Sequence, residues 1–328
     1  MIKSANSAFG KGRTGLEGFI DIHFIGNLLD QIFIPIEIRM ESNTALMIMV
    51  IIILLTMYLW FRQKPNYNLA PKIIWTYWDN PAKIPKTVTM CMKEWAKWNP
   101  DYEIILLTQK NYTGYVTIPY EIRTHPNFYD NPTRLADLVR VWVLAERGGV
   151  WIDSSTILKG RLDDWLFPKY AECSGFYMGS FTKNPKYPVI ESWFFACNKK
   201  CLFLEKWRDE FSEIARFPSV EKYVESRIKM GIDLQGIKDP IDLAMHISAQ
   251  KVLQLDHYST ESMILQKAED GPFRYVADAK WDSEKALELA CMDHSYQAPI
   301  MKMRGKERKV VEKKIGDAGW VEKCGFIS

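Results

Sequence analysis

The chain has 328 residues, of which 47% are hydrophobic and 25% charged, and its formal net charge is only +3. This composition excludes a disordered or collagen-like protein, because neither class keeps so many core-forming side chains. It also argues against a nucleic-acid-binding protein, since phosphate contacts require a cationic excess or a long Lys/Arg run that this sequence lacks. The six cysteines form no C-x-x-C pair, so we expect reduced, structural thiols rather than a disulfide scaffold or a zinc site.

A hydrophobic segment without charge covers residues 44–61. As a helix rising ~1.5 Å per residue it would reach about 27 Å, nearly the thickness of a hydrocarbon core, so we predict a single transmembrane helix. A cleaved signal peptide fits less well, because no small-residue cleavage site follows; a buried core helix is the other alternative. We expect residues 1–43 to be a poorly ordered tail, residues 62–70 a linker, and residues 71–328 the domain that carries function.

Basic residues flank the predicted span unevenly. Arg39 precedes it, whereas Arg62, Lys64 and Lys72 follow it. The positive-inside rule therefore favours a single-pass protein whose main domain is cytosolic, with a lumenal type II topology as the alternative. The oligomeric state is left open.

The main domain begins with alternating elements. A β-rich run at 71–78 is followed by a helical stretch at 86–98 and by a second β-rich run at 102–107. Alternation of strand, helix and strand predicts a wound α/β sheet with parallel neighbouring strands.

A helix and a strand are predicted next. Asn131-Pro132 is typical of a helix start, with Asn as N-cap and Pro at the first helical position, and Gly148-Gly149 is typical of its end. The hydrophobic run after the glycines ends on Asp153. Because open α/β sheets bind ligands at the carboxyl ends of their strands, Asp153 is a candidate ligand-binding carboxylate.

Three charged residues recur at intervals of three within that helix, namely Arg134, Asp137 and Arg140. This spacing places them on one helical face. Such a stripe is most often solvated, but a strand that ends on Asp153 directly after the helix favours a polar face turned toward a ligand.

The string A-D-L-V-R-V-W-V-L-A-E-R-G-G-V-W-I-D-S-S, residues 136–155, resembles the signature of glycosyltransferases with the GT-A fold. It is most similar to capsular polysaccharide synthesis proteins related to the family 32 glycosyltransferases with a D-x-D sugar-binding motif. Residues 71–75 with Trp78, and residues 189–196, resemble two further blocks of that family. The likeness is good over about residues 71–200.

The resemblance implies a GT-A-like, Rossmann-like domain with a mixed, mainly parallel sheet. It further implies transfer of a sugar from a nucleotide-diphosphate sugar to a glycan or lipid-linked acceptor, with retention at the anomeric carbon. Two alternatives are a non-catalytic, membrane-tethered glycan-binding module and a nucleotide-sugar hydrolase.

The resemblance also assigns roles to residues. Asp137, Arg140 and Asp153 match the catalytic set. Glu191 and Trp193, which lie in the family-like block at 189–196, are our candidates for the acceptor side. The residues expected around the donor are Trp75, Thr76, Tyr77, Trp78, Arg134 and Lys302.

The metal is the point at which this sequence departs from the family. Ser155 stands where the D-x-D motif has its second aspartate, and a hydroxyl is a weaker ligand for a hard cation than a carboxylate. His294 loosely matches a histidine that helps to hold the metal, although a lone histidine is more often structural. We expect Mn²⁺ or Mg²⁺ held by Asp153, Ser155 and His294, with looser dependence than in the family.

Overall fold

The computed structural model describes residues 42–62, 70–166, 171–293, 299–317, 319–320 and 324. The chain divides into two compact units, residues 1–65 and residues 66–328, which are described separately. The division falls within the segment predicted to be a linker.

The first unit contains helix α2 (Ser42–Arg62), which covers the predicted transmembrane segment. In the part of the chain that the structure describes, no helix is both long enough and apolar enough to cross a membrane. The structure therefore does not support the predicted span. The predicted tail up to residue 41 lies outside the described residues.

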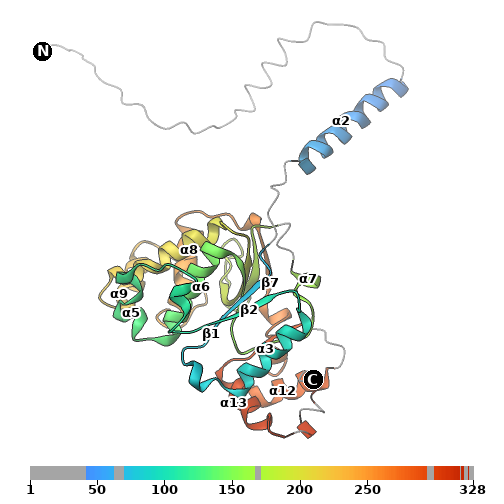
Figure 1. The fold of residues 1–328 in the computed structure, drawn as a ribbon. Helices are drawn as coiled ribbons and strands as arrows, with labels where there is room; N and C mark the ends of the chain where they lie inside the picture. Colours follow the sequence, from blue (N-terminus) through green and yellow to red (C-terminus); the bar gives the residue numbers. More distant parts are fainter. Residues whose placement is uncertain are drawn as a thin grey trace, which may run out of the picture. The chain divides into compact units, whose positions relative to one another are not determined.

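The second unit is built on a six-stranded sheet with the strand order β2-β1-β3-β6-β5-β7 (Figure 1). Strand β6 runs antiparallel to both of its neighbours, and the other pairs are parallel. This arrangement confirms the expected mixed, mainly parallel α/β sheet. The strands are β1 (Ile73–Tyr77), β2 (Glu103–Leu107), β3 (Gly149–Ile152), β5 (Cys173–Tyr177), β6 (Ile190–Cys197) and β7 (Met263–Lys267).

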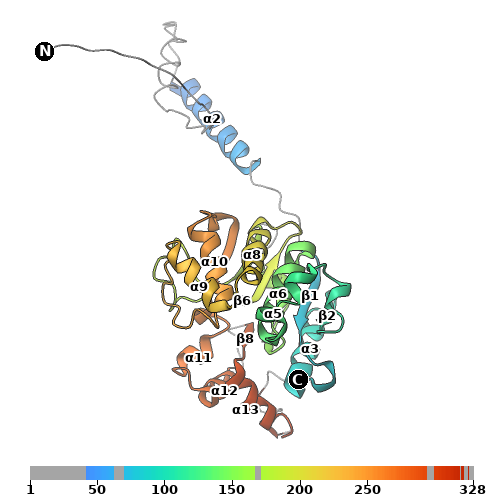
Figure 2. The ribbon, with the colours of Figure 1, turned by 90° about the vertical axis from the view of Figure 1, so that its left-hand side faces the viewer.

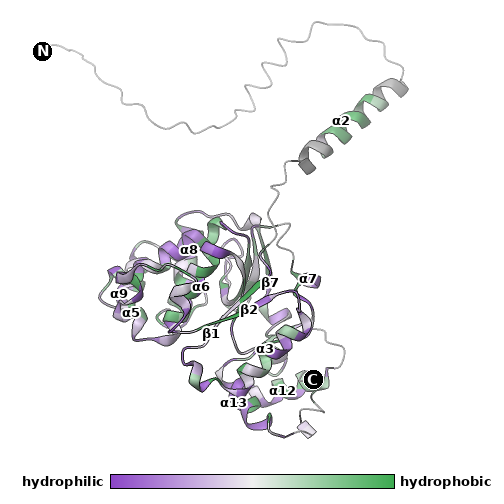
Figure 3. Cartoon of the chain, in the orientation of Figure 1, coloured by the Kyte–Doolittle hydropathy of each residue, from purple (hydrophilic) through white to green (hydrophobic). Residues whose placement is uncertain are grey.

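Helices cover the sheet (Figure 2). The longer ones are α3 (Lys86–Trp98), α6 (Pro132–Arg147), α8 (Leu202–Ser212), α9 (Val220–Lys229), α10 (Ala244–Gln254), α12 (Ser283–Met292) and α13 (Gly305–Lys314). The shorter ones are α4 (Tyr120–Arg123), α5 (Pro126–Tyr129), α7 (Leu162–Trp165) and α11 (Arg274–Asp278). Hydrophilic residues gather on peripheral helices such as α9 and α13 (Figure 3).

Alternate side chains of the central strands enter two hydrophobic cores. Trp151 and Phe195 belong to the core that includes α6, α8 and α10, whereas Val150 and Phe194 belong to the core that includes α3, α12 and α13. Every residue of β3 and β6 is buried. A sheet buried on both faces leaves the ends of its strands as the places where polar side chains meet solvent.

Helix α6 begins and ends where the sequence predicts. The side chain of Asn131 accepts a hydrogen bond from the backbone N–H of Arg134 at 3.0 Å, which caps the helix. Gly148 and Gly149 then adopt φ values of 65° and 100°. A Cβ atom on Gly149 would lie 2.8 Å from the carbonyl oxygen of Ile73, so this position requires glycine.

A second, two-stranded sheet joins distant parts of the chain. Strand β4 (Thr156–Leu158) follows β3 closely and pairs antiparallel with β8 (Ile300–Lys302). In this register Lys302 lies opposite Thr156. The C-terminal part of the chain is thereby fixed beside the end of β3.

A disulfide links Cys291 and Cys324. The expectation that all cysteines are reduced is therefore wrong for this pair. The other four are free and buried, namely Cys91, Cys173, Cys197 and Cys201. The two linked cysteines are 33 residues apart in sequence and meet only through the tertiary fold. Local spacing therefore carries no signal for this bond.

Candidate active site

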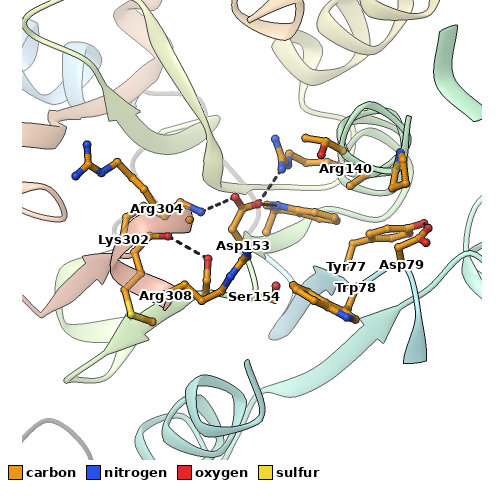
Figure 4. A pocket seen from close by; sticks show the side chains of 16 residues that line it. Tyr77, Trp78, Asp79, Arg140, Asp153, Ser154, Lys302, Arg304 and Arg308 are labelled. Carbon is orange, nitrogen blue, oxygen red and sulfur yellow. Dashed lines mark hydrogen bonds and ion pairs between the residues drawn. The ribbon is translucent and has the colours of Figure 1, made fainter. Parts of the chain in front are cut away.

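A cavity of about 380 Å³ lies at the carboxyl ends of β1 and β3 (Figure 4). Strand β1 contributes Tyr77 and the two residues that follow it, and β3 leads into Asp153. The opposite wall comes from Lys302 at the end of β8 and from the first turn of α13. The cavity thus occupies the edge of the sheet where ligands bind in open α/β folds.

Asp153 lies between two cations in this cavity (Figure 4). Its Oδ1 accepts hydrogen bonds from Arg140 Nη2 at 2.8 Å and from Trp151 Nε1 at 3.0 Å, and its Oδ2 accepts one from Lys302 Nζ at 2.6 Å. Burial alone would raise the pKa of Asp153, but the charges of Lys302 and Arg140 outweigh burial and lower this pKa to about 2. Asp153 is therefore ionised at neutral pH and both of its oxygens have partners.

Arg140 connects Asp153 to Asp137. Its Nη1 lies 2.7 Å from Asp137 Oδ1, and its guanidinium lies 4.9 Å from the centre of the Trp151 ring. Arg140 is 5% exposed. Burial raises the pKa of Asp137, and the charge of Arg140 offsets only part of that effect. Asp137 does not line the cavity, so it acts on the site by holding Arg140.

The Arg134 side chain contacts α5 rather than the cavity. Its Nη1 donates to the carbonyl oxygen of Asn127 at 2.8 Å and ties α6 to α5. Burial lowers the pKa of Arg134. Arg134 does not line the cavity, although the sequence pattern places it on the same helical face as Arg140.

Only the carboxyl end of β1 lines the cavity. Trp75 and Thr76 are buried, and Trp75 Nε1 donates to the carbonyl oxygen of Gly148 at 2.8 Å. Tyr77 and Trp78 line the cavity as expected. Trp75 and Thr76 are thus core residues here, and not contacts for a ligand in this cavity.

Asp79 was not identified from the sequence. It lines the cavity, and its Oδ1 accepts a hydrogen bond from the Tyr77 hydroxyl at 3.0 Å. Its position just past the end of the first strand is the signal that could have identified it, by the same argument that selected Asp153.

Arginines from α13 extend the basic wall that begins at Lys302. The Arg308 guanidinium lies 5.5 Å from the centre of the Trp78 ring, and no carboxylate among the described residues forms an ion pair with it. Arg304 is the N-cap of α13, is paired with Glu307, and lies 4.9 Å from the centre of the Trp281 ring. Arg308 is therefore the arginine better placed to meet an anion.

The two expected acceptor-side residues are buried in β6. Trp193 stacks on Phe176 with ring centres 5.3 Å apart. Glu191 lies 3.8 Å from His246 Nε2, and neither residue lines the cavity. His246, on α10, thus shares a buried polar contact with a residue that was assigned to the acceptor.

Two of the three residues expected to hold a divalent cation, Asp153 and Ser155, already have other partners. Both oxygens of Asp153 already have cationic or N–H partners, and the Ser155 hydroxyl donates to the carbonyl oxygen of Met303 at 3.1 Å. His294 lies outside the described residues. Over the ranges that the structure describes, no group of three His, Cys, Asp or Glu side chains could hold a metal ion. The predicted Mn²⁺ or Mg²⁺ site is not supported.

The structure is therefore that of an α/β protein with a charged cavity at the carboxyl ends of β1 and β3. The sequence profile of the capsular polysaccharide synthesis proteins matches residues 58–222, half of the chain, and the chain belongs to that family. This confirms the resemblance found in the sequence.

One curated relative is an O-glycosyltransferase, braB, from Annulohypoxylon truncatum. It is 26% identical over 159 residues, which are 44% of this chain and 38% of that protein. The match therefore spans well under half of the relative's length.

Three solved structures that partly match this chain are glycosyltransferases by title. The PaToxG glycosyltransferase has a TM-score of 0.32 at 14% identity and covers 57% of this chain and 87% of its own. A glycosyltransferase involved in glycosylation of the major capsid of PBCV-1 has a TM-score of 0.40 at 11% identity, covering 74% and 100%. The apo form of GlyE from Streptococcus pneumoniae TIGR4 has a TM-score of 0.37 at 16% identity, covering 78% and 62%.

Proposed function

We propose that residues 66–328 form a glycosyltransferase that moves a sugar from a nucleotide-diphosphate sugar to a glycan or lipid-linked acceptor. The observation that carries this proposal is the cavity that combines Asp153 with three aromatic side chains and a basic wall. A nucleotide-diphosphate sugar carries a flat base that stacks, hydroxyls that bind carboxylates, and a diphosphate that binds cations.

The lining residues suit the separate parts of such a donor. Trp78 offers an aromatic ring for the base, and Asp79 offers a carboxylate for ribose hydroxyls. Lys302 and Arg308 offer charge to the diphosphate from the opposite wall. Asp153, ionised and fixed by Arg140, faces the region between these walls and accepts hydrogen bonds from donor hydroxyls.

The reaction breaks the bond between the anomeric carbon and the diphosphate oxygen and forms one to the acceptor oxygen. The acceptor proton passes to the departing diphosphate, so no protein base is needed if configuration is retained, as the family resemblance suggests. The protein contributes position and charge stabilisation of the leaving group.

The charge state of Asp153 indicates its role in the cavity. A carboxylate with a pKa of about 2 is a poor base at neutral pH. Asp153 therefore fits the role of a fixed binding charge better than that of a general base.

The test is a screen of the purified full chain against a panel of nucleotide sugars, with and without acceptor glycans. Transfer that depends on the acceptor supports the proposal, and the anomeric proton signal of the product in NMR reports retention or inversion. Donor breakdown that is indifferent to acceptor would show a hydrolase instead. Glycan binding without turnover of any donor would show a binding module.

The compartment is part of the same proposal. We propose that residues 66–328 work in an oxidising compartment, the lumenal alternative, because disulfides are rare in the cytosol and the structure contains one between Cys291 and Cys324. Alkylation of protein from its native cells without reductant, followed by mass spectrometry, tests this. Free thiols at both positions would contradict this proposal and favour a cytosolic location of the domain.

A further inference from the structure

Ser155 stands where the D-x-D motif has its second aspartate, and its side chain is already hydrogen-bonded to the backbone. Ser155 is 6% exposed, and its hydroxyl donates to the carbonyl oxygen of Met303. Restoring a cation ligand there would require this hydrogen bond to break. The chain therefore offers Asp153 alone where the family motif offers two carboxylates.

Lys302 already holds the open side of Asp153. Its Nζ lies 2.6 Å from Asp153 Oδ2, and the two side chains point toward one another (Figure 4). This Nζ lies 5.8 Å from the centre of the Trp193 ring, and the Lys302 side chain is 12% exposed. A divalent cation bound to the same oxygen would lie against this ammonium and close to the Arg140 guanidinium. Like charges at such short range repel strongly in a partly buried site.

The backbone fixes Lys302 in this place. It pairs with Thr156 in the β4–β8 sheet, and its backbone N–H donates to the carbonyl oxygen of Pro272 at 3.0 Å. The backbone of Lys302 is thus held on both sides of its strand, and the ion pair with Asp153 holds its ammonium in the cavity.

We propose that Lys302 takes the place of the divalent cation: its ammonium, with Arg308 beside it, faces the diphosphate of the donor, and donor binding needs neither Mn²⁺ nor Mg²⁺. This inference rests on the proposed use of a nucleotide-diphosphate sugar. When the diphosphate binds, Lys302 bridges a phosphate oxygen and Asp153, which remains fixed by Arg140 and Trp151.

The experiment measures binding rather than turnover. UDP and GDP are titrated separately into the full chain by calorimetry, once in excess EDTA and once in MnCl₂. We expect at least one nucleotide to bind with the same affinity in both buffers. Lys302→Met should weaken that binding roughly ten- to hundredfold, the loss expected for a charge-assisted hydrogen bond, and Lys302→Arg should recover most of it.

Lys306→Met is the matched control. Lys306 is exposed on the first turn of α13 and does not line the cavity, so its loss removes the same charge without touching the site. Its nucleotide affinity should stay within about twofold of the unmodified chain, because an exposed charge contributes little. An equal loss in both variants would overturn the specific role of Lys302.

The outcomes separate this inference from the proposed function. Nucleotide binding seen only with Mn²⁺ overturns the inference and leaves the glycosyltransferase proposal standing. No binding of UDP or GDP in either buffer, together with no turnover of any nucleotide sugar, overturns both. If Lys302→Met fails to fold, the comparison of EDTA with MnCl₂ in the unmodified chain still decides the matter.

Discussion

The ion pairs of Asp153 link the cavity to the stability of the fold. Its pKa is lowered to about 2, below the ordinary value near 3.9, so its stabilising contribution is fully present above about pH 4 and is lost as pH falls toward 2. Asp153→Asn should therefore remove roughly 2–3 kcal/mol of unfolding free energy at pH 7, and turnover with it. Urea unfolding across this pH range measures the first effect.

Asp164→Asn supplies the control for that measurement, since Asp164 is exposed and lies outside the cavity. It should leave both turnover and the free energy of unfolding at pH 7 unchanged, because an exposed charge contributes little. Full activity in Asp153→Asn would contradict the assignment of the site.

Asp137 acts through Arg140 rather than on the ligand. Its Oδ1 lies 2.7 Å from Arg140 Nη1, and loss of this contact frees Arg140 to turn away from Asp153. Asp137→Asn should lower kcat/KM for the donor about ten- to hundredfold, the range for a charge-assisted hydrogen bond. Steady-state kinetics measure this. Unchanged donor kinetics with a lower melting temperature would assign the Asp137–Arg140 pair a purely structural role.

Local sequence pattern predicts two of the residues that line the cavity: Asp153 follows the end of a buried strand, and Arg140 lies on the helix that precedes this strand. Asp153 and Arg140 meet in the cavity for this reason. Trp75 and Thr76 do not reach it, because successive residues within a strand point into the two cores. Lys302 reaches Asp153 across 149 residues, and no local pattern shows that contact; only the family resemblance suggested it.

At the scale of elements, local sequence signals predict where two helices begin and end. Helix α3 (Lys86–Trp98) and helix α6 (Pro132–Arg147) begin and end as expected. The sequence does not predict that β6 is antiparallel or that β4 pairs with β8. Long-range packing determines which strands pair, and no local pattern reports it.

The glycine pair after α6 sets the direction of β3 and hence of Asp153. Gly149→Ala places a Cβ atom 2.8 Å from a backbone oxygen at a φ of 100°, and the strand that carries Asp153 must shift. We expect a loss of about 1–3 kcal/mol in stability, measured by thermal or urea unfolding. Gly114→Ala is the control, because no atom lies within 4 Å of the added carbon. Equal stability of the two variants would contradict the strained geometry at Gly149.

The disulfide closes a loop that contains β8 and α13, and therefore the whole basic wall of the cavity. Replacing Cys291 and Cys324 by serine should cost about 3–4 kcal/mol of stability, the loss expected for a loop of this length, and should weaken nucleotide binding. Unfolding and calorimetry with and without reductant measure both effects. Reductant should lower the stability and nucleotide affinity of the unmodified chain and leave both unchanged in the serine variant. A loss in the serine variant would show that the effect of reductant does not come from this disulfide.

At the scale of the whole molecule, every described residue of the cavity and each of its supporting contacts lies in the unit of residues 66–328. Removing residues 1–65 should therefore leave nucleotide affinity and melting temperature unchanged, because neither the cores nor the ion pairs around Asp153 lose a member. Calorimetry and thermal unfolding of the shortened and full chains in the same buffer measure this. Acceptor transfer provides a separate comparison: a chain that binds nucleotide normally but transfers poorly to a lipid-linked acceptor would show that the first unit serves the acceptor. A fall in nucleotide affinity itself would instead contradict the assignment of the donor site to the second unit alone.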